Sequence, residues 1–195
     1  LPSYPDKYFD LAIVDPPYKD ETDGLTMGHS RDFGLQTFKQ PKKEFFDEVR
    51  RVSVNQIFWG FNYYLEFLPN TDCVICWFKH QNGHFSECEY AWCSVGKSRH
   101  FDRSYQKDLY NKIHPTQKPM ALYRWLLKNY AKAGDNILDT HVGSASSLIA
   151  FEEMGFEYVG FELDPDYYRD SCKRLEGFRA QPKLFSGGEI FQASK

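Results

Sequence analysis

The chain has 195 residues, of which 26% are charged and 42% hydrophobic, and its formal net charge is −3. This length suits one α/β domain that buries roughly 70% of its unfolded surface. The composition excludes an intrinsically disordered chain. No apolar run is long enough to span a membrane, and the five cysteines form no disulfide-scaffold pattern. We therefore expect a cytoplasmic protein without a membrane span.

Four of the cysteines, Cys73, Cys76, Cys88 and Cys93, have a spacing that could suggest a zinc site. However, Cys73 and Cys76 belong to an apolar run that predicts a strand, in which they would point to opposite faces. We therefore expect no metal site.

The first half of the chain begins with a predicted buried strand over residues 9–14. The next residues, Asp15-Pro16-Pro17-Tyr18, end it because proline cannot continue a ladder of hydrogen bonds. A polar loop is expected over 19–40. The patterns then predict a helix over 42–52 and strands over 56–59, 72–78 and 89–95, with a turn at 81–83 between the last two.

The second half predicts a helix over 120–132, with Pro119 in its first turn and Gly134 after its end. A strand follows over 136–139, then a helix over 147–154, a strand over 158–161 and a helix from 164 to about 175. The alternation of strands and helices predicts a mostly parallel sheet with helices on both faces.

Two features of this second half suggest a binding site for a nucleotide-like ligand. The stretch from Asp139 to Ser144 reads as a strand tip, a small-residue loop and a helix start, where Gly143 allows close approach of a ligand. Glu162 ends the next strand, where an acidic residue can accept hydrogen bonds from a ribose. Because no phosphate-binding glycine pattern is present, S-adenosylmethionine fits better than NAD.

The Asp15-Pro16-Pro17-Tyr18 motif suits transfer to an exocyclic amino group of a base. The lone pair of such a nitrogen is delocalised into the ring, so acceptors aimed at both amino hydrogens favour its reaction. The carboxylate of Asp15 can accept one hydrogen, a backbone carbonyl of Pro16 or Pro17 the other, and Tyr18 can stack on the base. A base in a duplex must flip out to reach this pocket.

The ordered set of motifs resembles the DNA amino-methyltransferases, in particular the permuted group in which the catalytic motif precedes the cofactor motif. Besides the first motif, the resemblance rests on the segments 114–119, 134–144 and 160–164. It implies an α/β, Rossmann-like fold of S-adenosylmethionine-dependent methyltransferases. It also implies that Thr116, Gln117 and Lys118 hold the methionine end of the cofactor, that Asp139, Gly143 and Ser144 line its middle, and that Glu162 binds its ribose.

One departure from the family pattern lies in the loop after Asp139. The family usually reads D-P-F-x-G-S-G there, whereas this chain reads D-T-H-V-G-S-A. We expect His141 to act as a spacer in place of the usual phenylalanine.

A basic stretch lies between the two groups of motifs, where the permuted family places its target-recognition segment. We expect DNA contacts from Arg99, Arg103 and Lys107 because basic side chains can grip phosphates or guanine. The chain is thus expected to form one methyltransferase domain over 1–195. Its parts are a catalytic half (1–95), a short target-recognition segment (96–113) and a cofactor-binding half (114–180).

The expected activity is site-specific methylation of DNA at N6 of adenine. N4 of cytosine remains an alternative, although family members of that type more often carry serine in place of Asp15. RNA or protein glutamine is a further possible substrate. A non-catalytic partner subunit is the other class of function, although such subunits tend to lose the acceptor residue. A homodimer or a partner subunit that supplies specificity also remains open.

Overall fold

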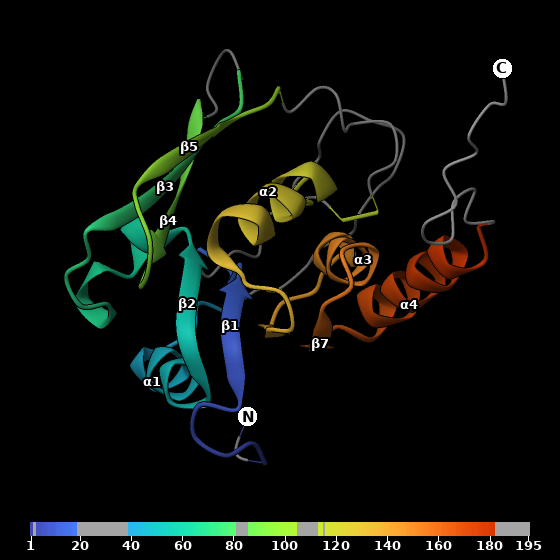
Figure 1. The fold of residues 1–195 in the computed structure, drawn as a ribbon, viewed down its shortest axis with the longest axis horizontal. Coiled ribbons are helices and arrows are strands. Elements are labelled where there is room, and N and C mark those ends of the chain that lie inside the picture. The colour runs from blue at the N-terminus through green and yellow to red at the C-terminus, as the bar shows by residue number, and fades with distance from the viewer. Residues whose placement is uncertain (2, 19–38, 81–85, 105–112, 115, 182–195) are drawn as a thin grey trace, which may run out of the picture.

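The computed structural model describes residues 1, 3–18, 39–80, 86–104, 113–114 and 116–181. These residues form one seven-stranded sheet with helices packed against it (Figure 1). The strands are β1 (Phe9–Val14), β2 (Ser53–Trp59), β3 (Cys73–Phe78), β4 (Cys88–Cys93), β5 (Arg99–Asp102), β6 (Asn136–Asp139) and β7 (Glu157–Gly160). The helices are α1 (Lys43–Val52), α2 (Met120–Tyr130), α3 (Ser146–Glu153) and α4 (Pro165–Arg179), and two 3-10 turns are η1 (Phe61–Tyr63) and η2 (Leu65–Phe67).

The strands lie in the order β5-β3-β4-β2-β1-β6-β7. All neighbouring pairs are parallel except those of β4, which runs antiparallel to both β2 and β3. The sheet is therefore mostly parallel, as predicted. The chain leaves β1 toward β2 on one side, while β6 leads to β7 on the other, so the strand order reverses between β1 and β6.

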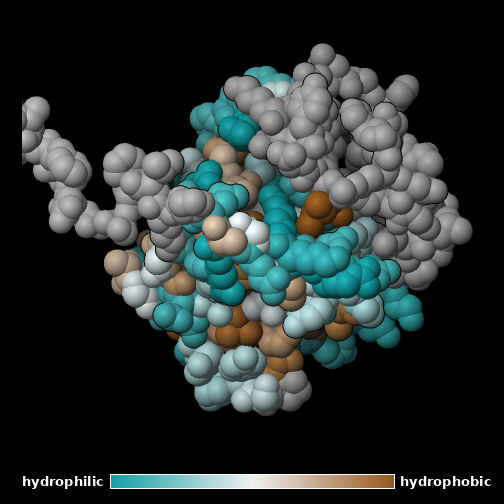
Figure 2. Space-filling view, turned by 90° about the vertical axis from the view of Figure 1, so that its right-hand side faces the viewer, coloured by the Kyte–Doolittle hydropathy of each residue, from teal (hydrophilic) through white to brown (hydrophobic). Residues whose placement is uncertain are grey.

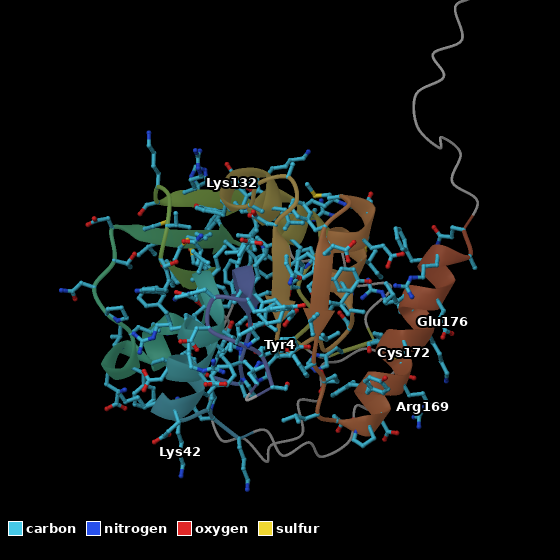
Figure 3. All side chains as sticks on the ribbon, turned by 60° about the horizontal axis from the view of Figure 1, so that its bottom comes forward. Tyr4, Lys42, Lys132, Arg169, Cys172 and Glu176 are labelled. Carbon is cyan, nitrogen blue, oxygen red and sulfur yellow. The ribbon has the colours of Figure 1, made fainter. Side chains whose placement is uncertain are left out.

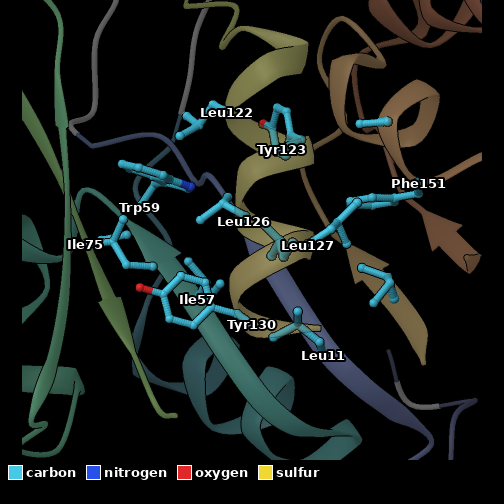
Figure 4. Packing of buried hydrophobic residues seen from close by; sticks show 14 of the residues in the cluster. Leu11, Ile57, Trp59, Ile75, Leu122, Tyr123, Leu126, Leu127, Tyr130 and Phe151 are labelled. Carbon is cyan, nitrogen blue, oxygen red and sulfur yellow. The ribbon is translucent and has the colours of Figure 1, made fainter. Parts of the chain in front are cut away.

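Each face of the sheet is covered by its own hydrophobic core. Because side chains alternate along a strand, Leu11 and Ile13 pack into the core beneath α2 and α3, which is also shown in Figure 4. Ala12 and Val14 instead pack into the second core together with α1, whose Phe46 is fully buried. The prediction of helices on both faces is therefore confirmed.

Three elements differ most from the predicted ones. β2 begins at Ser53, three residues early, and continues directly from α1. β5 is a short edge strand that pairs only with β3, and its mostly exposed residues give no hydrophobic pattern. α4 extends to Arg179, four residues beyond its predicted end. Arg169, Cys172 and Glu176 lie along this helix (Figure 3), and the surface on its side of the molecule is mostly hydrophilic (Figure 2).

Cys73 and Cys93 lie opposite each other on β3 and β4 as free thiols. Among the described residues, no group of three histidine, cysteine, aspartate or glutamate side chains could hold a metal ion. No helix in the same part of the chain is both long and apolar enough to cross a membrane.

Candidate active site

The candidate site lies along one edge of the sheet, where the carboxyl ends of the parallel strands meet. In an open α/β sheet, ligands bind at this edge where the strand order reverses, which here is between β1 and β6. The antiparallel strand β4 begins at the same edge. This arrangement brings together residues that follow or begin these strands: Asp15, Gly60, Lys79, Glu89, Asp139 and Glu162.

Asp15 follows β1 and is the carboxylate of the first motif. Its Oδ1 lies 2.6 Å from Nζ of Lys118 and accepts a hydrogen bond of 2.8 Å from the hydroxyl of Tyr18. The side chain is 17% exposed. Burial raises the pKa of Asp15 above its ordinary value, while the charge of Lys118 lowers it. The carboxylate is therefore held by Tyr18, which is close to it in the sequence, and by Lys118, which is far from it in the sequence but in contact with it.

Lys118 is almost fully buried, with 3% of its side chain exposed. Its ammonium contacts Asp15, Oε2 of Glu89 at 3.0 Å and the hydroxyl of Tyr18 at 3.1 Å. It also lies 5.3 Å from the ring centroid of Trp59. The resemblance assigns Lys118 to the cofactor, whereas the structure places its ammonium against the catalytic motif. Lys118 therefore links the two groups of motifs.

Glu89 and Lys79 extend this cluster toward β3, and the sequence did not predict a role for either. Oε1 of Glu89 lies 3.0 Å from Nζ of Lys79, whose side chain is 10% exposed. Lys118 and Lys79 lower the pKa of Glu89 to about 2 against the opposing effect of burial. The signals in the sequence are a charged residue next to each apolar strand and the predicted turn between the two strands, but nothing in it reveals that both residues reach Lys118 and Asp15.

The ring of Tyr18 fits closely against its neighbours. It stacks on Tyr63, with ring centroids 5.2 Å apart and 13° between the planes. Gly60 has φ +68°, and a Cβ atom there would lie 2.1 Å from the Tyr18 ring. The hydroxyl of Tyr64 donates to the carbonyl of Pro17. Because Tyr64 already uses this carbonyl, Pro16 becomes the better candidate for a free backbone acceptor.

Asp139 ends β6 on the other side of the strand reversal. It accepts the backbone N–H of His141 at 2.9 Å, and burial raises its pKa to about 7. Burial lowers the pKa of His141 to about 4, which leaves a neutral ring. That ring meets Phe45 edge-on, with centroids 5.4 Å apart. This packing agrees with the expectation that His141 acts as a spacer.

Glu162 bridges two loops at the end of β7. Its Oε2 accepts the N–H of Gly143 at 2.8 Å, and its Oε1 accepts the N–H of Asp164 at 3.0 Å. Ser144 is buried, and its carbonyl accepts a hydrogen bond of 2.6 Å from Arg174. The candidate ribose-binding carboxylate therefore also orders the loop that holds Gly143 and Ser144.

The turn before α2 is docked onto this loop by His114. The His114 ring lies 4.2 Å from that of Tyr167, and its Nδ1 accepts the N–H of Thr116 at 3.3 Å. A Cβ atom on Gly143 would lie 3.5 Å from His114. Gln117 is buried and accepts the N–H of Ile113 at 3.1 Å. In the structure, Thr116 and Gln117 therefore stabilise the turn before α2, and this turn places Lys118 in the site.

The structure describes two of the three candidate DNA-binding residues, at the two ends of β5. Arg103 follows β5 at the edge that holds the site, and its carbonyl accepts the indole N–H of Trp77 at 3.0 Å. It lines a cavity of about 480 Å³ together with His80, Phe101, Asp102, Ser104 and Ala121. Arg99 begins β5, beside Ile75 in the middle of β3, and so lies farther from the site than Arg103. Lys107 lies outside the described residues.

Solved structures with a similar fold include a SAM complex and a DNA methyltransferase. M1.HpyAVI in complex with SAM matches 87% of this chain and 89% of its own, with a TM-score of 0.60 and 19% identity. The cytosine-N4-specific PvuII DNA methyltransferase matches 95% of this chain and 84% of its own, with a TM-score of 0.61 and 13% identity. The fold is therefore the Rossmann-like fold of S-adenosylmethionine-dependent methyltransferases.

The family follows from the sequence comparison. The model of the N6_N4_Mtase family, described as DNA methylase, matches residues 76–173, and the chain belongs to this family. The type II methyltransferase M2.DpnII of Streptococcus pneumoniae is 36% identical over 63 residues, which are 32% of this chain and 24% of that protein. The putative methylase YubD of Escherichia coli K12 is 34% identical over 65 residues, which are 33% and 29% of the two chains. The matched region spans less than a third of either relative.

Proposed function

We propose that this chain is a DNA methyltransferase that uses S-adenosylmethionine to methylate the exocyclic amino group of a flipped-out base, namely N6 of adenine. The observation that carries this proposal is the placement of Asp15, held by Tyr18 and Lys118, across the strand reversal from the Asp139–Glu162 edge. One side offers acceptors for an amino group, and the other offers a polar, acidic site for a cofactor.

The residues on the cofactor side fit S-adenosylmethionine in charge and polarity. Asp139 and Glu162 make no ion pair with a lysine or arginine in the part of the chain that the structure describes. Carboxylates without cationic partners suit a ligand that carries a positive sulfonium and an amino group. The buried hydroxyl of Tyr167 also finds no hydrogen-bond partner among the described residues. When bound, the cofactor supplies an electrophilic methyl group.

On the catalytic side, Asp15 accepts one amino hydrogen of the target base and the carbonyl of Pro16 accepts the other. These two bonds draw the nitrogen lone pair out of conjugation with the ring. The carboxylate also stabilises the positive charge that develops on nitrogen, and such preorganised charge is worth most in a site that excludes water. Tyr18 stacks on the flipped base, as aromatic side chains do in nucleic-acid sites.

The choice of adenine over cytosine rests on Asp15. Family members that methylate N4 of cytosine more often carry serine at this position. A non-catalytic partner subunit is the competing class of function, and the retention of Asp15, Tyr18 and Glu162 with intact contacts favours catalysis.

The test is to incubate the protein with methyl-labelled S-adenosylmethionine and duplex DNA and to identify the modified nucleoside by mass spectrometry. N6-methyl-2′-deoxyadenosine as the labelled nucleoside is expected. Labelled N4-methylcytosine would replace the proposed base while keeping the reaction. Cofactor binding without transfer to any DNA would favour the partner subunit.

A further inference from the structure

A row of four ion-paired charges, two of them buried lysines and two half-buried carboxylates, runs from β3 to the catalytic motif. Lys79 contacts Glu89, Glu89 contacts Lys118, and Lys118 contacts Asp15, with N–O distances of 3.0, 3.0 and 2.6 Å. The exposed fractions of these side chains lie between 3% and 23%. Two positive and two negative charges cancel, so the cluster is neutral when Asp15 is ionised.

This row of ion pairs ends at one oxygen of Asp15, Oδ1. Lys118 and Tyr18 both reach Oδ1, at 2.6 and 2.8 Å. Among the described residues, neither makes a corresponding contact with Oδ2. Two donors on one oxygen fix the rotation of the carboxylate and leave the second oxygen for another hydrogen-bond donor. Under the proposed function, that donor is the target amino group.

Stability alone is a weak explanation for this cluster. Taking charges out of water costs several kcal/mol per ion, and buried ion pairs can often be replaced by apolar residues without loss of stability. The lysines and Glu89 nevertheless lie at the site edge, and Lys118 is also held over the rings of Trp59 and Tyr18. The position of the cluster therefore points to a role in the site.

We propose that Glu89, itself held by Lys79, is a positioning residue for methyl transfer: it shares the Lys118 ammonium with Asp15 and so sets how tightly this ammonium holds the catalytic carboxylate. Without Glu89, Lys118 would turn fully to Asp15 and weaken it as an acceptor. Without Lys79, Glu89 would draw Lys118 away. This inference rests on the proposed function because it assigns the free oxygen of Asp15 to the target amino group.

The two substitutions Glu89→Gln and Lys79→Gln should move the titration of Asp15 in opposite directions. Glu89→Gln removes a nearby negative charge and leaves Lys118 to Asp15, so the carboxyl loses its proton at lower pH. Lys79→Gln removes a positive charge and draws Lys118 toward Glu89, so the carboxyl loses its proton at higher pH. Each change is expected to be about one pH unit.

Other groups around Asp15 stay the same in both variants. Besides Lys118 and Glu89, the titratable groups that face it come from its own loop, from the turn after η1, from α2 and from β6; they are Tyr18, Tyr64, Tyr123 and Asp139. Removing a negative and a positive charge already gives opposite shifts, so the coupling through Lys118 is tested by combining the two substitutions. The variant Glu87→Gln is the matched control, because Glu87 is exposed and lies two residues before Glu89.

The experiment combines two measurements on the full chain. The first is the acid limb of kcat for methyl transfer to DNA. The second is the titration of the Asp15 carboxyl carbon by NMR in protein labelled at aspartate, with the signal assigned from Asp15→Asn. Glu89→Gln should move both to lower pH and reduce the plateau of kcat by about tenfold, as for a misplaced catalytic group. Lys79→Gln should move both to higher pH.

A double variant tests the coupling and also serves if Glu89→Gln folds poorly, because it buries no unpaired charge of this pair. In Lys79→Gln/Glu89→Gln, the loss of Lys79 has no carboxylate at position 89 through which it could act on Lys118, so both measurements should stay at lower pH than in the unaltered protein. Wild-type values in this double variant, or shifts in the same direction for both single variants, would overturn the inference. Opposite NMR shifts without any methyl transfer would contradict the proposed function, whereas methyl transfer with an unshifted titration would contradict the role of Glu89.

Discussion

The two halves of the sheet bring carboxylates to the same edge but give them different partners. Asp15 and Glu89 are paired with buried lysines. Asp139 and Glu162 accept backbone N–H groups instead. The first half therefore balances its charge internally and suits a neutral donor such as an amino group. The second half has no lysine or arginine paired with its carboxylates among the described residues, and it suits a cation.

We call the half of the sheet that carries Asp15 and Glu89 the balanced side, and the half that carries Asp139 and Glu162 the acidic side. The largest effect is expected from Asp15→Ala on the balanced side. The carboxylate stabilises charge that develops only in the transition state, so kcat should fall at least about a hundredfold, roughly 2.7 kcal/mol. Affinity for S-adenosylmethionine should be retained because the cofactor binds on the other half. Asp72→Ala is the control, because Asp72 is exposed before the opposite end of β3. Normal turnover by Asp15→Ala would remove it from catalysis.

The fit of Tyr18 on this side can be tested without changing any charge. A methyl group on Gly60 would clash with the Tyr18 ring, so Gly60→Ala should displace the ring and lower kcat by between about tenfold and a hundredfold. Gly155→Ala is a close control, because Gly155 also has positive φ, +77°, but nothing lies within 4 Å of its added Cβ. Both variants should lose stability through their positive φ, and Gly60→Ala should lose more because of the clash, as thermal unfolding would measure. Equal kcat in the two would show that the position of Tyr18 does not matter.

On the acidic side, Glu162→Ala should weaken binding of S-adenosylmethionine about tenfold, since a charged hydrogen bond contributes about 1.5–3 kcal/mol. The loss includes disorder in the loop of Gly143, whose N–H Glu162 accepts. Calorimetry measures the affinity, with Glu157→Ala, at the exposed start of β7, as the control. Unchanged affinity would place the ribose elsewhere.

The pKa of Asp139, raised by burial to about 7, gives the acidic side a pH dependence. The carboxylate attracts a cationic cofactor only when ionised, so affinity for S-adenosylmethionine should rise severalfold as the pH increases through about 7. Because this pKa exceeds the ordinary value of 3.8, Asp139 stabilises the ligand-free fold while protonated, and this stability is lost as the pH rises through about 7. Asp139→Asn should flatten both pH profiles. A profile that keeps its slope in this variant would assign it to another group.

The sequence predicted the acidic side better than the balanced side. Asp139, Gly143 and Glu162 follow strands that periodicity identifies, and their contacts with one another are local along 139–164. The balanced side depends on β3, β4 and β1 lying in one sheet, which brings Glu89 to Asp15 across 74 positions. Hydrophobic periodicity predicts strands but not their order in the sheet, so a role in the site was predicted for neither Glu89 nor Lys79. The short edge strand β5 was missed because its residues are mostly exposed.

The smallest expected effect is a change in the salt dependence of DNA affinity, which should differ between substitutions at the two ends of β5. Arg103 lies at the edge that holds the site, whereas Arg99 pairs with Ile75 in the middle of β3, so of the two we expect Arg103 to contact DNA whose flipped base reaches Asp15. A phosphate contact releases a counterion, so Arg103→Ala should lower the slope of log affinity against log salt by about 1. Arg99→Ala has the same change of charge and should leave the slope unchanged. DNA affinity measured across a salt series decides between them. An altered slope for Arg99→Ala alone would place the DNA away from the carboxylates of both halves, and this placement would contradict the proposed site.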